Sequence, residues 1–554
     1  MRIGILHQYS LFGSGSGVYA RNLAHRLARR GHRACLISRD FHPDRYDFIE
    51  EAYFHRGDGV RFLFRRSPSP RCVAHTLLGE VVPLAYPRPE RPNGKLFTEL
   101  SDGEIERYVG YQARKVREIA LQHGLELLHV NHALLMPYVA RLVKAQLGLP
   151  YVVTVHGRTI EYVLKKDERY RPYAAQGLGG AEKVIVLNRD VRERVLAFCP
   201  EVEARLVELP VGVDVGLFRP VAPSARRASV AALLREARRK ERSGKTAELQ
   251  ELTYSLPDQG LAEGELLARL REIRASYTSN YPDKNLRDKL RSIEWDRERV
   301  VIYFGQLSLE KGVHCLIAAM PEIVACRPEV RLLVVGDGVS REVLELLVAT
   351  LDRGEVELAR RLLAAADGEF AEPLLGFFDA LDVEDYRRKA RDADLRRAVV
   401  FTGYLTRKEL SKLLPCAELS VIPSLVREAF PLVFVESLAC GVLPVAPRFG
   451  GLAPALDELA AKLGPLGEMA GVRYGQGMIR DLAERIPAIL SMLGEKDTKE
   501  RVARLCRELA VSKYDWEGII SRLEEIYSES RDPNLEPQPL IHDSQFIVQR
   551  GGGS

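Results

Sequence analysis

Two glutamates eight residues apart, Glu428 and Glu436, are the side chains of this sequence best suited to chemistry on a polar ligand. They lie in the stretch 419–446, LSVIPSLVREAFPLVFVESLACGVLPVA. The apolar runs at its two ends predict buried strands, and the segment from Pro431 predicts a helix that ends at Cys440–Gly441. Proline suits a first helical position because it lacks the amide hydrogen that would be unpaired there. We therefore expect Glu428 in the turn before the helix and Glu436 about two turns farther along the same face.

The start of this helix offers backbone amide hydrogens beside the carboxylates. Such amides bind anionic oxygen, and carboxylates accept hydrogen bonds from sugar or ribose hydroxyls. A sugar nucleotide carries both kinds of group, so the stretch predicts a ligand of this class. A buried strand-helix-strand unit whose acids face solvent would show the same pattern. The residues expected to contact the ligand at the helix start are Ala429, Phe430, Pro431 and Leu432.

The stretch resembles the Glu-x7-Glu signature of retaining glycosyltransferases of family 4, which have the GT-B fold. Two more segments match that family in the expected order, the block GSGVYARNLAHRLARRGH at 15–32 and the turn GQLSLEKG at 305–312. Each motif alone is a weak signal, but three in order are a strong one. The resemblance implies an α/β protein of the GT-B class, with two Rossmann-like domains facing across a cleft. The donor would lie mainly on the second domain and the acceptor mainly on the first.

The resemblance also implies roles for individual residues. Lys311 and His156 would join Glu428 as the catalytic group. Lys311 would stabilise the departing diphosphate, Glu428 would orient the donor sugar and Glu436 would bind the ribose. His156 follows the predicted strand 151–155 and would contact the donor sugar, although a structural histidine capping the strand would occupy the same place. Neither a metal ion nor a cofactor is implied, because the nucleotide sugar is itself a substrate.

Gln306 departs from the family pattern. The family has an arginine at this place in the phosphate-binding turn, whereas glutamine donates hydrogen bonds without carrying charge. Lys311 is therefore the only cation expected in the turn, and Arg427 is a conceivable substitute for the missing charge. The resemblance implies further ligand contacts from the glycine-rich first loop, at residues 13–17, and from the turn after the predicted strand 399–402, which meets the nucleotide base in the family. These residues are Gly15, Gly17, Gly403 and Leu405.

Alternating strands and helices predict parallel sheets covered on both faces. We expect an N-terminal, acceptor-side domain over residues 1–215 and a C-terminal, donor-side domain over 216–512. A helix at about 513–530 is expected to pack back on the first domain. Residues 531–554 read as a loose tail that closes with a Gly-Gly-Gly-Ser linker.

Three segments lie outside the resemblance. Residues 41–100 are rich in Arg and Pro and have no clear period, so we expect a long excursion that could form part of the acceptor wall. Residues of about 222–297 and 350–397 are highly charged and helical in pattern, which predicts two insertions. The basic run Arg235–Arg242 could bind nucleic acid or anionic lipid, but acids interleaved farther along favour a solvated surface.

The composition is ordinary for a globular protein, with 46% hydrophobic and 28% charged residues. The 81 basic and 76 acidic residues nearly balance, so we expect no nucleic-acid partner. Eight scattered cysteines without a CxxC pair predict a reduced, cytoplasmic protein and argue against a zinc site. No apolar run is long enough for a transmembrane helix, and Arg2–Leu6 reads as a strand rather than a signal peptide.

The acceptor class stays open at this level: a sugar, a small molecule and a lipid-linked molecule all fit. The predicted helix 18–30 carries four arginines that could make a weak contact with the inner face of an anionic membrane. The same positions suit a solvated helix face over a sheet.

Two other functions deserve comparison. Gly15-x-Gly17-x-x-Ala20 fits the dinucleotide fingerprint, with Asp40 after the second strand, which would indicate an NAD- or FAD-dependent oxidoreductase. Against this, residues 7–14 separate the first glycine from its strand, and the motifs of the second half would have no role. A non-catalytic nucleotide-sugar-binding protein is the other alternative, because the turn lacks the family arginine. Turnover of a labelled sugar nucleotide separates an enzyme from such a binder.

Overall fold

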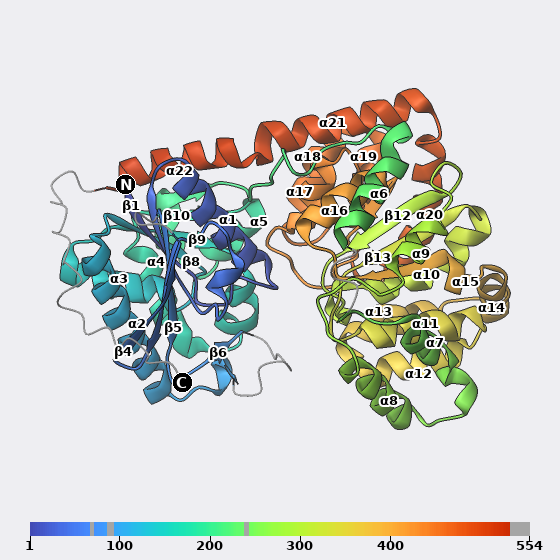
Figure 1. Cartoon of the computed structure of the whole chain (residues 1–554), viewed down its shortest axis with the longest axis horizontal. Helices are drawn as coiled ribbons and strands as arrows, with labels where there is room; N and C mark the ends of the chain where they lie inside the picture. Colours follow the sequence, from blue (N-terminus) through green and yellow to red (C-terminus); the bar gives the residue numbers. More distant parts are fainter. Residues whose placement is uncertain (67–70, 86–93, 238–242, 532–554) are drawn as a thin grey trace. The chain divides into compact units, whose positions relative to one another are not determined.

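In the computed structural model, the chain forms two compact units (Figure 1). Of the residues that the structure describes, the first unit contains Met1–Gly212, the short segment Glu428–Phe430 and residues 516–531. The second unit contains Val213–Arg427 and Pro431–Asp515. The structure describes residues 1–66, 71–85, 94–237 and 243–531.

The first unit is built on a nine-stranded sheet with the strand order β11-β10-β9-β8-β1-β2-β5-β3-β4. Neighbouring strands are parallel except for the antiparallel pair β3 and β4. Strands such as β9, YVVTV, are buried at every residue, as expected for a sheet covered on both faces. The strands are β1 (Arg2–Leu6), β2 (Arg33–Ser38), β3 (Glu51–Arg56), β4 (Gly59–Arg65), β5 (Cys72–Leu78), β8 (Leu127–Asn131), β9 (Tyr151–Val155), β10 (Lys183–Val186) and β11 (Leu206–Glu208), with β6 (Pro83–Leu84) and β7 (Lys95–Leu96) as a separate small pair.

Helices lie on both faces of this sheet (Figure 1). The longest helix of the unit, α2, begins with a capping box between Ser101 and Glu104 and ends at Gly124, whose left-handed backbone suits glycine. The helices of the first unit are α1 (Gly15–Arg29), α2 (Asp102–His123), α3 (Met136–Leu147), α4 (Arg171–Gly179), α5 (Arg189–Leu196) and α22 (Trp516–Ser530).

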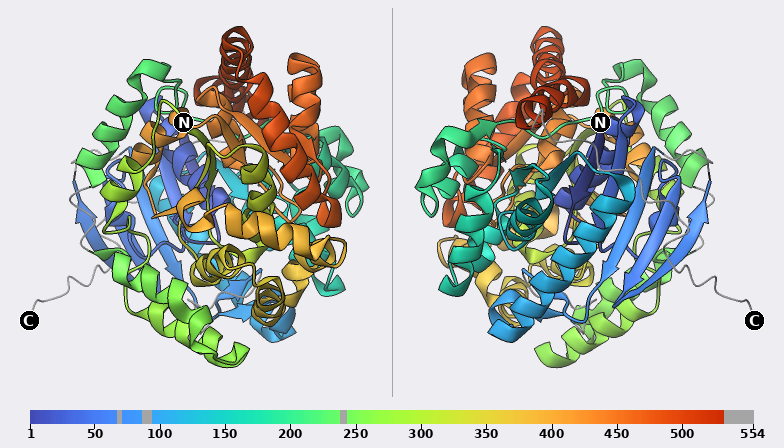
Figure 2. Two further views of the ribbon diagram at one scale, coloured as in Figure 1. Left: turned by 90° about the vertical axis from the view of Figure 1, so that its right-hand side faces the viewer. Right: turned by 90° about the vertical axis from the view of Figure 1, so that its left-hand side faces the viewer.

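The prediction of an aperiodic excursion over residues 41–100 is wrong. This segment supplies β3, β4 and β5, which extend the sheet beyond β2 (Figure 2, blue strands). The sequence pattern hides them for physical reasons. β5, CVAHTLL, is buried although it contains His75 and Thr76, and β4 is a largely exposed edge strand. Neither an apolar run nor a clean alternation is therefore visible.

The glycine-rich block is also not the loop that we expected over residues 13–17. Helix α1 begins at Gly15, and the Ser14 side chain accepts a hydrogen bond from the amide of Gly17 at 3.1 Å. Glycine is a poor helix former, which disguises the helix start, but a serine cap compensates for part of that cost. Gly15 and Gly17 thus form the first helical turn.

The second unit is built on a six-stranded, fully parallel sheet with the order β14-β13-β12-β15-β16-β17. The strands are β12 (Arg299–Phe304), β13 (Val330–Val335), β14 (Val399–Gly403), β15 (Leu419–Val421), β16 (Leu443–Pro447) and β17 (Gly471–Val472). The helices are α6 (Arg226–Ala237), α7 (Ala247–Ser255), α8 (Glu263–Ala275), α9 (Leu286–Arg291), α10 (Val313–Cys326), α11 (Arg341–Asp352), α12 (Val356–Ala366), α13 (Gly368–Asp379), α14 (Val383–Asp392), α15 (Leu395–Ala398), α16 (Arg407–Leu413), α17 (Leu432–Ala439), α18 (Leu452–Leu463), α19 (Pro465–Met469), α20 (Met478–Met492) and α21 (Lys496–Tyr514).

Helix α17 begins one residue later than predicted. Pro431 is its cap residue, with extended backbone, and Leu432 is the first helical residue. Glu428 lies in the segment before the helix and belongs to the first unit, whereas Glu436 lies within the helix. The prediction that the two glutamates lie along one helix face is therefore wrong, because Glu428 lies outside the helix.

The first charged segment, about 222–297, folds as part of the second unit. Leu256, Leu266, Leu270 and Ile273 pack in one core cluster with Leu346 of α11 and Leu362 of α12. In the same segment, the fully buried Lys245 forms ion pairs with Glu345 and Glu342. The segment thus shares a core with its unit. Of the predicted basic run 235–242, residues 238–242 lie outside the part of the chain that the structure describes, as do residues 532–554 of the predicted tail.

Helix α22 (red in Figure 1) packs against α1 within the first unit. Arg26 pairs with Glu517 at 3.1 Å, and Glu524 binds both Arg30 at 2.9 Å and His32 at 2.8 Å. Much of the basic face predicted for α1 is thus directed toward acids of the same unit.

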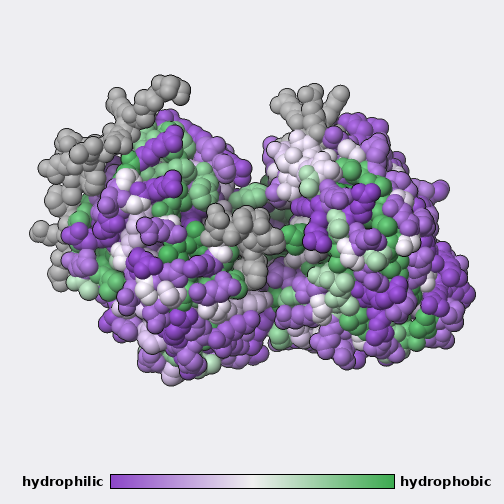
Figure 3. Space-filling model, turned by 90° about the horizontal axis from the view of Figure 1, so that it is seen from below, coloured by the Kyte–Doolittle hydropathy of each residue, from purple (hydrophilic) through white to green (hydrophobic). Residues whose placement is uncertain are grey.

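The surface seen in Figure 3 is mostly hydrophilic, with smaller hydrophobic patches. Among the described residues, no helix has the length and apolar composition needed to cross a membrane.

Candidate functional site

The turns that follow β12, β13 and β14 meet at one edge of the second sheet, at the carboxyl ends of its strands. The amide of Leu307 donates to the carbonyl of Asp337 at 3.0 Å, and the amide of Gly336 donates to that of Gly403 at 3.0 Å. The turns are thus joined by backbone hydrogen bonds into one edge. In an open parallel sheet, ligands bind at this edge.

Lys311 lies in the first of these turns, directly before α10, and is half-buried. Gly312 has a φ of +70°, and a β-carbon there would lie 1.7 Å from the carbonyl oxygen of Pro423. The amide of Leu425 donates to the carbonyl of Glu310 at 3.0 Å. The Lys311 turn is therefore fixed against the segment that follows β15, and only glycine fits at position 312.

The side chain of Gln306 is exposed in the same turn, and its backbone carbonyl accepts a hydrogen bond from Tyr303 at 2.7 Å. The guanidinium carbon of Arg427 lies 5.9 Å from the centre of the Phe449 ring, so the two side chains form a cation–π contact.

Glu436 is buried, with 3% of its surface exposed, and forms an ion pair with Arg407 at the start of α16. Burial raises the pKa of Glu436, although Arg407 opposes the shift. The guanidinium of Arg407 also lies 5.0 Å from the centre of the Phe218 ring. A ribose contact by Glu436 would therefore be shared with Arg407. Sequence reasoning missed Arg407, although the capping-box pattern Thr406-x-x-Glu409 marks the helix start on which it lies.

The turn after β14 is covered by the end of the first charged segment. The amide of Asp283 donates to Thr402 at 2.9 Å, and the amide of Tyr404 donates to Tyr281 at 3.0 Å. Gly403 has a φ of +74°, and the Leu405 side chain is buried. Any ligand at this turn would therefore lie beside residues from outside the predicted family core.

In the first unit, Glu428–Phe430 pack at the start of α5. Asn188 caps that helix and donates its side-chain amide to the carbonyl of Ala429 at 2.7 Å. Arg194 donates to the carbonyl of Glu428 at 3.4 Å. These contacts fix the backbone that carries the half-buried Glu428 side chain. Pro431 and Leu432, which follow in the second unit, are also half-buried.

His156 directly follows β9 and is buried in the first unit. Its Nε2 lies 2.8 Å from Oδ1 of Asn131, whose own amide nitrogen donates to the carbonyl of Leu6 at 3.0 Å. That second bond sets the orientation of the Asn131 amide, so His156 donates through Nε2 and its Nδ1 carries a lone pair. Burial lowers the pKa of His156 to about 3, so the ring is neutral near pH 7.

Two further histidines lie at this edge, and sequence reasoning missed both. The ring of His132, directly after β8, lies 4.9 Å from that of His156 and 5.2 Å from that of His7, which follows β1. Burial lowers the pKa of His7 to about 4. His132 has a φ of +75°, and neither of its ring nitrogens has a hydrogen-bond partner among the described residues. A polar ligand or water would satisfy such nitrogens. The available signal was the position of each histidine directly after a strand.

The glycine-rich turn serves packing as well. A β-carbon at Gly17 would lie 2.6 Å from the carbonyl oxygen of Ser10, whereas the space at Gly15 is open. Asp40 accepts hydrogen bonds from the Ser10 hydroxyl at 2.9 Å and the Leu11 amide at 2.8 Å. Its carboxylate therefore holds the loop before α1, instead of presenting itself to a ribose as the oxidoreductase alternative requires.

Two family models match this chain. The model of the glycosyl transferase 4-like domain matches residues 14–212, and that of the glycosyl transferases group 1 matches residues 287–357 and 374–504. Most of the first charged segment, up to residue 286, lies outside both matches.

Individual relatives agree with these matches. Glycogen synthase of Mycobacterium tuberculosis is 27% identical over 241 residues, which are 44% of this chain and 45% of that protein. The chain thus spans about half the length of the curated relatives that it matches first. Sucrose-phosphate synthase from Thermosynechococcus elongatus has a TM-score of 0.56 at 18% identity, covering 95% of this chain and 98% of that one. Anabaena Alr3699/HepE in complex with UDP has a TM-score of 0.55 at 15% identity, covering 95% and 100%.

The predicted GT-B class is confirmed by these solved structures, and none of the matches supports an oxidoreductase. The two family models cover most of the chain in the order expected from its motifs. The protein therefore belongs to the GT-B glycosyltransferases of the family 4 type.

Proposed function

We propose that the protein transfers a glycosyl group from a nucleoside-diphosphate sugar to a hydroxyl group of an acceptor, with retention of anomeric configuration. The observation that carries the proposal is the edge of the second sheet, where Lys311 lies in a turn locked against the neighbouring turns. A lysine and backbone amides held at the carboxyl ends of parallel strands suit a diphosphate. The transferases of known name that resemble the chain support the same reaction class.

The diphosphate leaves with negative charge, and Lys311 is proposed to stabilise that charge together with the first-turn amides of α10 and α17. Gln306 is proposed to donate a hydrogen bond to the same group without neutralising it. These residues act electrostatically and require no cofactor in addition to the nucleotide sugar.

Glu428 is proposed to orient the donor sugar, and Glu436, with Arg407, to bind the ribose. His156 is proposed to accept a hydrogen bond from a sugar hydroxyl through Nδ1, since its Nε2 is engaged by Asn131. A neutral imidazole suits a hydroxyl because it adds no net charge beside an uncharged ligand. His7 and His132 extend the same surface for hydroxyl groups.

UDP is the first nucleotide to test, because the Anabaena relative in the fold comparison was solved with UDP. A set of UDP-, ADP- and GDP-sugars is screened by thermal shift, since a ligand that binds the folded state raises its apparent stability. The best binder is then offered in radiolabelled form with sugar, small-molecule and lipid-linked acceptors. Binding followed by label transfer supports the proposal. Binding without transfer to any acceptor class, and without hydrolysis of the donor, favours a non-catalytic nucleotide-sugar-binding protein.

A narrower proposal concerns the class of acceptor. If the acceptor is lipid-linked, the protein is proposed to bind weakly to the inner face of an anionic membrane. Arg29 and Arg33 are exposed near the end of α1, whereas Arg26 and Arg30 are paired with α22. Sedimentation with anionic and neutral vesicles at low and high salt tests this, because salt screens surface charge. Protein that stays in the supernatant with anionic vesicles at low salt would favour a water-soluble acceptor.

A further inference from the structure

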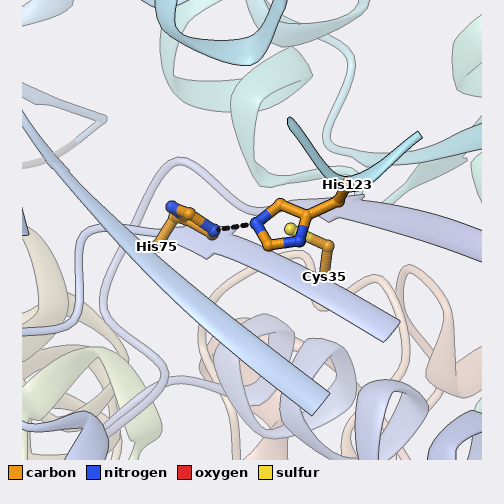
Figure 4. A group of neighbouring side chains, drawn as sticks. All are labelled: Cys35, His75 and His123. Atoms are coloured by element: carbon orange, nitrogen blue, oxygen red, sulfur yellow. Dashed lines mark hydrogen bonds between the residues drawn. The ribbon is translucent and has the colours of Figure 1, made fainter. Parts of the chain in front are cut away.

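A second group of chemically capable side chains lies against one face of the first unit's sheet, away from the carboxyl ends of the strands. It contains Cys35 of β2, His75 of β5 and His123, the last residue of α2 (Figure 4). Cys35 and His75 are buried, and His123 is half-buried. One ligand atom from each residue lies within 4.8 Å of the other two. None of the three belongs to the proposed glycosyl-transfer machinery.

The strand register explains why these side chains meet. Cys35 pairs with Val73 and Ile37 pairs with His75 in the parallel pair β2 and β5. Because side chains alternate between the faces of a sheet, Cys35 and His75 lie on one face, in diagonal positions. Helix α2 ends over this face and brings His123 to within 2.8 Å of His75, measured between their Nε2 atoms.

A fourth residue orients the group. Nε2 of His55, on β3, lies 2.7 Å from Nδ1 of His75. Histidines that bind metals usually engage their second ring nitrogen in such a hydrogen bond, which sets the tautomer and the ring direction. With His55 as acceptor, His75 carries its proton on Nδ1 and presents the Nε2 lone pair toward Cys35 and His123.

We propose that Cys35, His75 and His123 bind one zinc-type divalent cation, which fastens the end of α2 to the sheet. A set of one thiolate and two imidazoles is typical of zinc, and water would complete a four-coordinate site. Tetrahedral zinc at ordinary bond lengths requires donor separations of about 3.3–3.6 Å. The 2.8 Å nitrogen–nitrogen separation is shorter than this range, so binding would lengthen it slightly, and one ligand atom of each residue lies within 4.8 Å of the others.

The proton balance of the binding step is defined. The Cys35 thiol loses its proton to solvent as the sulfur–metal bond forms. The hydrogen bond between His75 and His123 breaks: His75 keeps its proton on Nδ1, and the proton of His123 moves from Nε2 to Nδ1, so both rings remain neutral. One proton is released for each ion bound, without any oxidant or reductant.

The scattered cysteines without a CxxC pair speak against zinc sites whose ligands are close in sequence, but not against a site formed by distant residues. Here the three donors come from two strands and the end of a helix, 40 and 48 residues apart along the chain. They come together only because β2 pairs with β5, and the sequence pattern of segment 41–100 did not predict β5.

The first test is cobalt spectroscopy on protein made without a polyhistidine tag and dialysed against a chelator. Addition of Co²⁺ is expected to give one ion per chain, a thiolate-to-cobalt charge-transfer band and release of one proton per ion. Cys35→Ser should abolish the band. Cys72→Ser is the matched control: Cys72 is an equally buried thiol of β5 on the opposite face from His75, and this variant should keep the band.

The second test measures affinity and stability. His123→Ala removes a half-buried ligand, so the variant should fold, and its Zn²⁺ affinity should fall at least tenfold. Zn²⁺ should raise the melting temperature of the wild type and of Cys72→Ser, but raise that of Cys35→Ser and His123→Ala much less. Equal Zn²⁺ affinity in wild type, Cys35→Ser and His123→Ala would overturn the proposal, and so would the absence of a cobalt band in wild type. Neither readout depends on glycosyl transfer.

Discussion

The carboxyl edges of the two sheets are built from different chemistry. In the second unit, the edge is made of backbone turns locked by close contacts at Gly312 and Gly403, with Lys311 as a cation among them. In the first unit, the edge presents the buried imidazoles of His7, His132 and His156. Burial lowers the pKa of each ring, so this edge offers neutral hydrogen-bonding groups.

This difference teaches how one sheet architecture can serve two kinds of ligand. Amides and a lysine suit the charge of a diphosphate, whereas neutral imidazoles suit hydroxyl groups. Each unit would then bind a different chemical group of the substrates. Substitutions at one edge at a time show whether that edge affects nucleotide affinity, kcat/KM or the stability of the protein.

The largest effect is expected for Lys311→Ala. Loss of the lysine should reduce kcat/KM by a free energy of about 2–4 kcal/mol, the range for removing one group that stabilises developing charge. It should also weaken UDP binding, measured by calorimetry. Gln306→Ala, in the same turn, is the control and should cost clearly less because glutamine carries no charge. Equal activity of Lys311→Ala and wild type would contradict the assignment.

Gly312→Ala is expected to destabilise the second unit by about 2–3 kcal/mol, because a positive φ is strained for alanine and its β-carbon would collide with Pro423. Urea unfolding measures the change. Gly15→Ala is the matched control, since no atom lies within 4 Å of its β-carbon position, and it should be nearly neutral. Equal stability of the two variants would show that the close contact at Gly312 does not stabilise the second unit.

His156→Gln tests the first edge. Removal of the ring should reduce kcat/KM by a free energy of about 1.5–3 kcal/mol, because one hydrogen bond and the packing of the ring are lost. The affinity for UDP should stay close to that of wild type. The contrast with Lys311→Ala sharpens the comparison, because only the lysine variant should lose affinity for the nucleotide. A large loss of UDP affinity in His156→Gln would show that the two edges are not specialised in this way.

The smallest effect, counted for one histidine and one pH unit, is expected from pH. Burial lowers the pKa of His156 to about 3 and that of His7 to about 4, below the ordinary value of 6.5. As the pH falls, these histidines therefore become protonated at a higher pH in the unfolded chain than in the folded protein. The stability from neutral burial is complete above about pH 6.5 and is lost as pH falls toward 4, by about 1.4 kcal/mol per pH unit for each histidine. Urea unfolding of wild type at several pH values measures the slope, and His156→Gln should reduce it by one histidine.

Strand–helix alternation predicted the parallel sheets, because it is visible in neighbouring residues, and the resemblance of three motifs to the family implied the GT-B class. Both predictions are confirmed. The site assignment for Lys311, Glu428 and His156 stays a prediction, and the variants above test it for Lys311 and His156. The first charged segment shows the limit of local reading, because its helices were expected but their common core with α11 and α12 was not.

By itself, the sequence determined the elements whose periodicity and caps lie within a few residues, such as β9 and α2. Only the tertiary structure decided which distant side chains meet. Arg407 reaches Glu436, and His132 reaches His156, because their strand and helix ends converge at sheet edges. Cys35 and His75 lie on one face because β2 pairs with β5 in a particular register. The pairing of distant strands depends on packing throughout the unit, so a local sequence pattern does not predict which strands pair or in which register.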